Sequence, residues 1–294
     1  MANNIALFQA YVPILDEVYK EASKTAVLDG NPELAQEGAN AGELVIPMMD
    51  MEGLGDYSRN DGYVNGDVTL THQTVPVNFD RGRMFSVDSL DDAESAGVAF
   101  GLLAGEFVRV KVVPELDAFR FATYAAKEGI SKAGVTAALT DGAAVVSALR
   151  SATNKLDEDE VPMEDRCLFI TPSLFALIQD MDANKSREVL SRFDQGGLVP
   201  QSRCYTAIEQ LSGKEGEKAG GYRKAPGGQA INFMVIHKAA VIQFPKHIAP
   251  KVIDPETNPS ADAWKFGYRQ VGVVDVYKNK VAGIYLHYLD GSQG

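Results

Sequence analysis

The stretch DSLDDAESAGVAFGLLAGEFVRVKVVPELDAFRFATYAAK, residues 88–127, decides the fold. Its apolar and small side chains recur three or four positions apart over 93–110, which predicts one stripe along a continuous helix. Asp88 or Ser89 can cap this helix, and Pro114 is expected to kink or split it because proline has no N–H to donate. A helix of this length would span roughly 55–60 Å. A helix of this length favours a single long element, here called the spine, on which other parts of the chain pack. The alternative interpretation is a pair of ordinary helices packed in an α/β enzyme.

Composition and charge narrow the possible classes of protein. The chain has 294 residues, 45% of them hydrophobic, which is enough for one large or two modest domains with a core. Its net charge of −12 gives no basic footprint for reading nucleic acid, although it is compatible with lining a compartment that holds DNA. Cys167 and Cys204 are too few for a disulfide framework and lack zinc spacing. With no signal peptide and no apolar run of ~18 residues, we expect synthesis in a reducing cytoplasm and no membrane partner.

The segments before the spine have no core of their own. Residues 1–42 combine an amphipathic helix pattern between Phe8 and Tyr19 with a linker composition over 30–42. We expect this arm to lie on another surface, such as a neighbouring subunit. Residues 43–88 read as a strand, a turn-rich loop and a second strand, which predicts a long two-stranded projection. An isolated hairpin is marginal in water, so this projection also needs a partner surface.

Arginines supply all the positive charge of the projection. No lysine occurs in residues 25–110. Asp80, Arg81 and Arg83 lie where the projection returns to the spine, and Arg59 lies in its turn-rich tip. Because arginine pairs carboxylates in a bidentate way across interfaces, these four residues are candidate inter-subunit contacts. The alternative interpretation is a solvated surface cluster.

The region 128–230 alternates helix and strand patterns, as a compact α/β region does. We expect the following elements: a helix capped by Asp141 that runs to about Asn154, a buried strand over Arg166–Thr171, a helix opened by Pro172 that ends near Asp180, a second helix over 183–193, and an exposed mobile loop over 212–229. The glycines of that loop do not form a phosphate-binding P-loop, because the first glycine and the final hydroxyl of the motif are missing.

The last part of the chain is rich in β-branched and aromatic residues. We expect strands over 231–237 and 240–244 and between Trp264 and Leu289, with a turn at 278–280. Residues 246–259 carry three prolines and are expected to form a loop.

Motifs for catalysis or metal binding are missing. His72, His237, His247 and His287 do not lie at metal-ligand spacing from one another or from a cysteine. The acidic run 157–160 is typical of a solvated face. We therefore predict no catalytic, cofactor-binding or metal-binding residue and no cofactor. An α/β enzyme with catalytic residues scattered along the chain stays open as an alternative.

Several stretches taken together resemble the major capsid proteins of tailed bacteriophages. The resemblance covers residues 43–290, and the order and spacing of the stretches carry it rather than any single motif. They are GDYSRN (55–60), GYVNGD (62–67), FDRGRMF (79–85), VVPELDAF (112–119), DAWKFGYR (262–269) and NKVAGIY (279–285).

The resemblance implies an α+β chain with the HK97-like capsid fold. It divides the chain into an N-terminal arm (1–42), an extended E-loop hairpin (43–88), the spine helix of a P-domain (89–135), an α/β A-domain (136–230) and C-terminal strands that return to the A-domain and the P-domain β-sheet (231–294).

The function implied is structural. Such a chain self-assembles as pentamers and hexamers into the icosahedral head that encloses phage dsDNA, so we expect a virion protein assembled in the host bacterial cytoplasm. A portal is one implied partner. Some relatives carry a long N-terminal scaffolding region, and because residues 1–42 are too few to hold one, the resemblance also implies a separate scaffolding protein or a cleaved one. An encapsulin-like cellular shell of the same fold is the alternative. The type member cross-links an E-loop lysine to a neighbour's asparagine; residues 43–88 contain no lysine, so we expect no such covalent bond.

Overall fold

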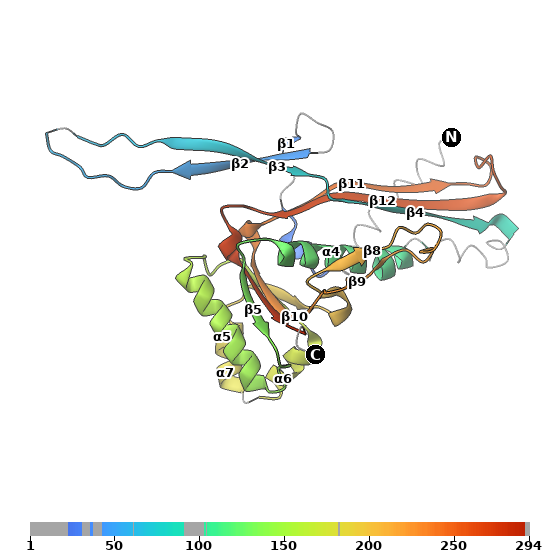
Figure 1. The fold of residues 1–294 in the computed structure, drawn as a ribbon. Coiled ribbons are helices and arrows are strands. Elements are labelled where there is room, and N and C mark those ends of the chain that lie inside the picture. The colour runs from blue at the N-terminus through green and yellow to red at the C-terminus, as the bar shows by residue number, and fades with distance from the viewer. Residues whose placement is uncertain are drawn as a thin grey trace.

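The chain is described here by a computed structural model that covers residues 23–30, 36–37, 43–60, 62–90, 103, 105–181 and 183–291. Within these residues the molecule has a projecting hairpin, a long three-stranded sheet beside a helix, and a five-stranded sheet with helices below it (Figure 1). The expected helix between Phe8 and Tyr19 and the spine segment 91–102 lie outside the described residues. No helix in the described part of the chain is both long and apolar enough to span a bilayer.

The projection is an antiparallel hairpin, as the sequence predicts. Strand β2 (Glu43–Met51) pairs with β3 (Val68–Pro76) along nine residues each, and the short β1 (Gln36–Glu37) adds to the edge of β2. Among the hairpin residues whose side chains are described, the buried ones lie at its base, where Leu44, Ile46 and Val75 pack with a cluster on the neighbouring sheet. The remainder extends away from the body of the molecule (Figure 1).

The long sheet has the strand order β11–β12–β4. Its strands are β4 (Phe79–Asp88), β11 (Val241–Ile253) and β12 (Ala263–Val276). Residues 79–88 therefore leave the hairpin, so the prediction of one projection over 43–88 was wrong in its last ten residues. The reason is tertiary: β4 pairs with β12 over its whole length, and Phe79 is buried against the spine helix.

The loop predicted over 246–259 was also wrong in its first half. Strand β11 continues through Pro245 and Pro250 to Ile253, with one irregularity in register between Pro245 and His247. It lies at the edge of the three-stranded sheet. In an edge strand, proline is tolerated at positions where the backbone N–H would point away from the sheet. No neighbouring strand needs a hydrogen bond from those positions, so the missing N–H of proline costs little.

The described part of the spine helix runs from residue 105 to 126 and does not break at Pro114. A π-helical turn, Val108–Val112, leads directly into α4 (Val113–Ala126), and the N–H of Val113 donates to the carbonyl of Val108, five residues earlier. Pro114 has no backbone N–H to donate, and the wider π-helical turn before it lets the helix continue without that hydrogen bond. The spine therefore contains a π-helical turn where a kink or split was expected. The predicted cap at Asp88 is confirmed, because its Oδ1 accepts the N–H of Leu90 at 2.9 Å.

The third part is a five-stranded sheet of order β5–β13–β10–β6–β7. Its strands are β5 (Ser131–Val135), β6 (Arg166–Ile170), β7 (Gln195–Leu198), β10 (Ala230–His237) and β13 (Ile284–Leu289). The helices α5 (Gly142–Glu158), α6 (Pro172–Gln179) and α7 (Ala183–Leu190) pack on one face. The other face packs on α4 through Phe121 and Tyr124. The spine thus joins the two sheets.

Most local predictions for this region are confirmed. Asp141 accepts the N–H of Ala143 at 3.3 Å, although the helix it caps continues to Glu158. All five residues of β6 are buried, and Pro172 begins α6. The turn at 278–280 also forms, but the strands on either side of it, β12 and β13, belong to different sheets.

The glycine-rich stretch 212–229 is more ordered than predicted. It contains β9 (Tyr222–Lys224), which pairs with β8 (Ile208–Gln210) in a small two-stranded sheet beside α4 (Figure 1). The turn between these strands folds against β4, where Arg81 and Arg83 donate hydrogen bonds to its backbone carbonyls.

Candidate interaction surface

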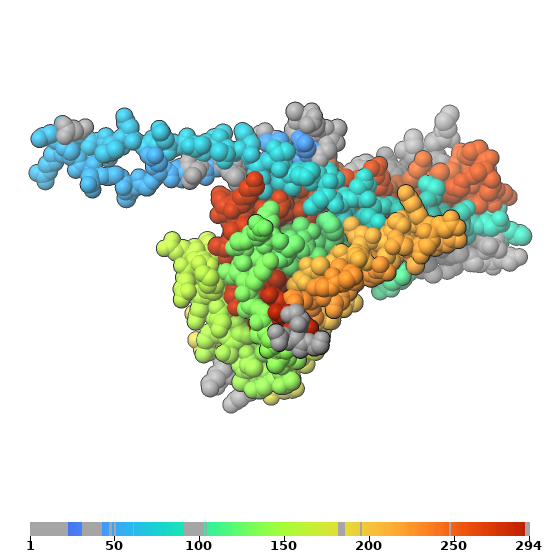
Figure 2. Space-filling view, viewed as in Figure 1, coloured from blue at the N-terminus to red at the C-terminus, as the bar shows by residue number. Residues whose placement is uncertain are grey.

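The hairpin tip is the most exposed apolar surface among the described residues. Of the thirteen large hydrophobic side chains that are exposed in the described part of the chain, eight belong to this one hairpin: Met49, Met51, Leu54, Tyr57, Tyr63, Val64, Val68 and Leu70. In the space-filling view the hairpin stands clear of the body (Figure 2). Scattered exposed hydrophobics are normal, but a contiguous group of this kind marks an interaction site.

The tip combines these apolar groups with negative charge. Its residues 50–67 contain five carboxylates against one guanidinium, a net charge of −4. Tyr57 and Tyr63 face each other across the loop with ring centroids 4.9 Å apart. Ser58 and Gly62 exchange two backbone hydrogen bonds, which hold the turn between them. Arg59, predicted from the sequence to contact a neighbour, is exposed in this turn and forms no ion pair with the described residues.

The structure places the other three predicted contact residues on β4, where each has partners in its own chain. Asp80 accepts two hydrogen bonds from the guanidinium of Arg269 on β12, at 2.8 and 2.6 Å. That bidentate pair lowers the pKa of Asp80 below its usual value and raises that of Arg269. Because both side chains are largely in water, solvent screens the pair and it contributes little to stability.

Arg81 joins three elements. Its Nε donates to Glu115 of α4 at 2.7 Å, and one Nη donates to the carbonyls of Leu211 and Gly221 at 2.7 and 3.2 Å. Glu115 also accepts from Gln210 of β8 at 3.3 Å. This partly buried guanidinium therefore ties β4, the spine helix and the β8–β9 turn together.

Arg83 holds the end of the same turn. Its guanidinium donates to the carbonyls of Lys218 and Ala219, at 2.7 and 3.3 Å. Gly213 and Gly220 lie beside it with φ of +70° and +62°, and a Cβ on Gly220 would come within 2.7 Å of Arg83. Glycine is therefore favoured at both positions by its positive φ, which residues with a side chain rarely adopt.

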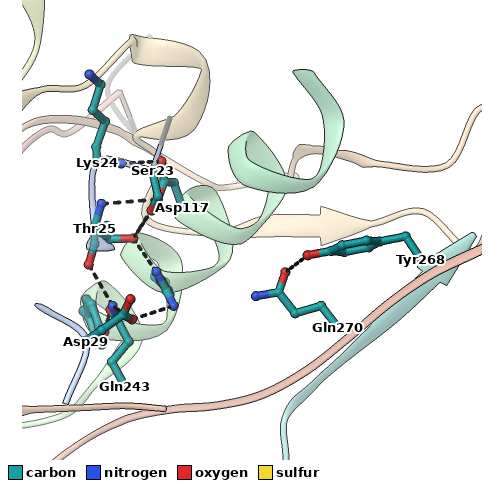
Figure 3. A network of polar contacts seen from close by, with 10 residues as sticks. Ser23, Lys24, Thr25, Asp29, Asp117, Gln243, Tyr268 and Gln270 are labelled. Atoms are coloured by element: carbon teal, nitrogen blue, oxygen red, sulfur yellow. Dashed lines mark hydrogen bonds and ion pairs between the residues drawn. The ribbon is translucent and has the colours of Figure 1, made fainter. Parts of the chain in front are cut away.

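A buried polar network fixes the segment 23–30 to the spine (Figure 3). Asp117 is fully buried and accepts hydrogen bonds from Ser23, Lys24 and Thr25, the shortest at 2.6 Å from the Thr25 hydroxyl. Arg203 pairs with the same carboxylate at 3.1 Å. Part of the predicted arm is thus bound to its own chain rather than to a neighbour, because its polar groups complete a buried charge.

The other half of this network surrounds Arg120 and Gln243. Arg120 donates to the Thr25 hydroxyl at 2.8 Å and to Asp29 at 3.1 Å. Gln243 of β11 donates to Asp29 and to the Thr25 carbonyl, each at 2.7 Å, and accepts from Tyr124 at 2.6 Å. Sequence reasoning did not identify these residues. The signal was present, since Asp117 and Arg120 are charged residues within the apolar pattern of the spine helix.

Among the described residues, no three histidine, cysteine, aspartate or glutamate side chains converge as metal ligands would. In the acidic run 157–160, Asp157 pairs with Arg166 and Arg192 at 2.7 and 2.8 Å. Burial works to raise the pKa of Asp157, but the two arginines outweigh it and lower that pKa. Burial lowers the pKa of His287, whose ring nitrogen lies 3.0 Å from Asn232.

Both cysteine thiols are buried, and burial raises the pKa of Cys167 to about 11 and that of Cys204 further. Neither thiol is therefore ionised enough near neutral pH to act as a nucleophile.

Comparison with solved structures identifies the fold. No protein-family model and no curated protein matches the sequence. The capsid of Myoviridae phage XM1 is 13% identical with a TM-score of 0.55, covering 91% of this chain and 92% of that one. The capsid of cyanophage P-SCSP1u is 12% identical with a TM-score of 0.55, covering 86% and 85%. A virus-like particle from Pyrococcus furiosus is 13% identical with a TM-score of 0.59, covering 96% and 99%. The chain therefore has the α+β, HK97-like fold that its sequence resemblance implies.

Proposed function

We propose that this chain is a major capsid protein that assembles with copies of itself into the icosahedral head of a tailed phage. The observation that carries the proposal is the exposed apolar hairpin, which a monomer leaves in water, on a fold that capsid proteins share over most of their length. We infer that neighbouring subunits cover this hairpin within pentamers and hexamers. The role is structural, with no catalytic residue and no cofactor.

The energy available from the hairpin supports this role. Fully burying one large apolar side chain contributes roughly 1.5–3 kcal/mol. Covering even half of the surface of the eight exposed side chains would thus contribute on the order of 10 kcal/mol per subunit. Association costs an estimated 4–15 kcal/mol, so one hairpin roughly balances that cost. Further contacts repeated around a closed shell then make assembly favourable.

We retain Arg59 and Arg83 as proposed contacts with a neighbouring subunit. Arg59 lies at the exposed tip of the hairpin. Arg83 is also exposed, and its guanidinium donates hydrogen bonds to the backbone carbonyls of Lys218 and Ala219. Asp80 and Arg81 are proposed to act indirectly, because their ion pairs with Arg269 and Glu115 hold the shape of β4.

We also propose dsDNA as the content of the shell, a separate scaffolding protein and a portal as assembly partners, and the host bacterial cytoplasm as the place of assembly. The net charge of −12 is consistent with this content, because a negatively charged shell would repel DNA weakly and DNA would not adhere to it. No membrane is proposed to take part.

Expression of the full chain followed by negative-stain electron microscopy tests the proposed function. We expect closed, uniform shells, with or without a coexpressed scaffolding protein. A variant lacking residues 50–66 keeps the buried base of the hairpin, so it should remain a folded, soluble subunit but form no stable shells. Intact shells from this deletion would contradict the proposal. Shells that enclose protein cargo would support a cellular compartment instead, and a small oligomer with enzymatic turnover would support an enzyme.

A further inference from the structure

The loop between β8 and β9 is braced by hydrogen bonds of its own. We call residues 212–220 of this loop the lid. The carboxylate of Glu217 accepts the backbone N–H and the hydroxyl of Ser212 at 2.7 and 2.8 Å. The N–H of Glu217 donates to the carbonyl of Lys214, and the N–H of Gly220 donates to the carbonyl of Glu217, each at 2.9 Å. The lid is therefore held together as one unit.

The neck of the lid is fixed separately. The N–H of Leu211 donates to the carbonyl of Gly221 at 2.8 Å, and Arg81 donates to the carbonyls of both residues. Arg81 is in turn paired with Glu115 of the spine helix. At the junction of lid and neck, Gly220 and Gly221 have φ of +62° and +79°. Because glycine adopts positive and negative φ about equally well, these two residues can absorb a rotation of the lid about its neck.

Arg83 of β4 holds the lid against the long sheet. Its guanidinium donates to the carbonyls of Lys218 and Ala219 at 2.7 and 3.3 Å. Every residue of the lid is exposed or half-buried, and a groove of about 840 Å³ lies beside the lid, between β4 and the spine helix. Opening the lid therefore breaks the two hydrogen bonds from Arg83 and takes no lid side chain out of a buried core.

The hydrogen bonds of Arg83 use weak acceptors. Its guanidinium is exposed and forms no ion pair with a carboxylate among the described residues. Both of its acceptors are neutral carbonyls. A carboxylate can instead accept two parallel hydrogen bonds from a guanidinium, as Asp80 does from Arg269 on the same sheet, and each such bond is roughly twice as strong. A carboxylate that reaches Arg83 from outside therefore competes favourably with the lid for the same donors.

We propose that Arg83 is the latch of this lid, and that a carboxylate supplied by a neighbouring copy of the chain releases it. In the free subunit the guanidinium holds the lid against β4. When the guanidinium pairs with the incoming carboxylate, the lid turns about Gly220 and Gly221 and the groove beside it widens. This inference rests on the proposed function, in which Arg83 contacts a neighbouring subunit, and adds that forming the contact changes the shape of the subunit.

Distances between two spin labels test the latch. The native cysteines are buried, so labels can be attached at Glu215→Cys in the lid and Ser86→Cys on β4, both exposed positions. Electron paramagnetic resonance of the free subunit should give one narrow distance distribution. Arg83→Ala should broaden it and move most molecules to longer distances. The matched control is Arg269→Ala, which removes an exposed arginine that bonds Asp80 of the same sheet and should keep the narrow distribution.

Two results would overturn the latch. One is an unchanged distribution in Arg83→Ala, because the lid would then be held by other contacts. The other is equal broadening in Arg269→Ala, because any change in the long sheet would then loosen the lid.

Sodium acetate supplies a carboxylate without a neighbouring copy. Compared with sodium chloride at the same ionic strength, acetate should raise the population of the longer distance several-fold in the labelled subunit with Arg83 intact. It should have no such effect on Arg83→Ala. Equal distributions in the two salts would contradict release by a carboxylate.

Assembled shells show whether assembly itself releases the lid. Labelled chains diluted into an excess of unlabelled chains report distances within one chain. We expect the longer distance to dominate in shells, and shells that keep the short distance would overturn release by a neighbour. Failure of the unmodified chain to form any shell would instead count against the proposed function, while the measurements on the free subunit would still decide whether Arg83 latches the lid.

Discussion

Single residues of this chain act mainly by completing buried charges. Asp117 is the clearest case, because its carboxylate is fully buried and accepts hydrogen bonds from three residues of the segment 23–30 as well as from Arg203. A buried carboxylate is tolerated only when its acceptor sites are filled. One side chain of α4 thus determines where the segment 23–30 packs on the spine helix.

Asp117→Asn should release this segment. The amide keeps the shape of the carboxylate but loses its charge and half of its acceptors, and the ion pair of Asp117 with Arg203 is lost. We expect a loss of about 3 kcal/mol in the free energy of unfolding, measured by urea denaturation. Trypsin should also cleave after Lys24 faster than in the unmodified chain. Unchanged cleavage and stability would show that the segment is held by other contacts.

At the scale of elements, ion pairs at the ends of helices and strands fix how neighbouring elements meet. The end of α5 provides an example: Asp157 pairs with Arg166 at the start of β6 and with Arg192 just after α7. Arg166 is fully buried and also donates to the carbonyls of Val161 and Pro162. One carboxylate thus fixes how two helices and a strand meet.

Asp157→Asn should make this junction weaker in a pH-dependent way. The pKa of Asp157 is lowered in the folded chain from its ordinary 3.8, so its ionised form stabilises the fold above that value, and the contribution is lost as the pH falls through the lowered pKa. Because the carboxylate is partly in water, we expect a loss of about 1 kcal/mol at pH 7. Denaturant unfolding of both proteins should show this difference at pH 7 and a smaller difference as the pH falls below 3.8.

Strand pairing shows why some elements could be predicted and others not. The hairpin β2–β3 closes over residues near in sequence, and its alternating pattern was enough to predict it. Strand β4 follows after only two residues, yet it pairs with β12, more than 170 residues away. No local pattern identifies such a partner, because β-propensity describes a pleated, half-buried surface without saying which strand lies beside it.

In the whole molecule, the buried apolar clusters lie in the body and at the hairpin base, whereas most of the exposed large apolar side chains lie in the hairpin. Among the described residues, four buried clusters hold the body and the hairpin base together, and no described residue of the tip belongs to them. Stability of the subunit and assembly of the shell should therefore respond to different mutations.

Leu54→Ser combined with Tyr63→Ser tests this separation. Both side chains are exposed, Tyr63 to 87%, so the free energy of unfolding of the subunit should change by less than about 0.5 kcal/mol. Assembly should fall sharply, because the tip loses apolar surface that only a neighbour buries. Sedimentation velocity measures the assembled fraction, and Met163→Ser is the control. A normal yield of shells would show that the tip is not part of the interface.

The amino-acid sequence alone determines the local elements of this protein. The cap at Asp88, the buried strand β6, the helix that follows Pro172 and the projecting hairpin all follow from patterns within a few residues, since capping, periodicity and proline geometry act locally. The order and spacing of short stretches also indicated the shared fold, which the solved structures confirm.

Only the tertiary structure decides which elements are neighbours. It moves β4 from the hairpin to the long sheet, places a π-helical turn in the spine just before Pro114, and gives Asp80 a partner 189 residues away. It also binds residues 23–30 to Asp117 and folds the β8–β9 turn around Arg81 and Arg83. These outcomes depend on which buried charges and carbonyl groups meet in space, and distance along the chain carries no information about that.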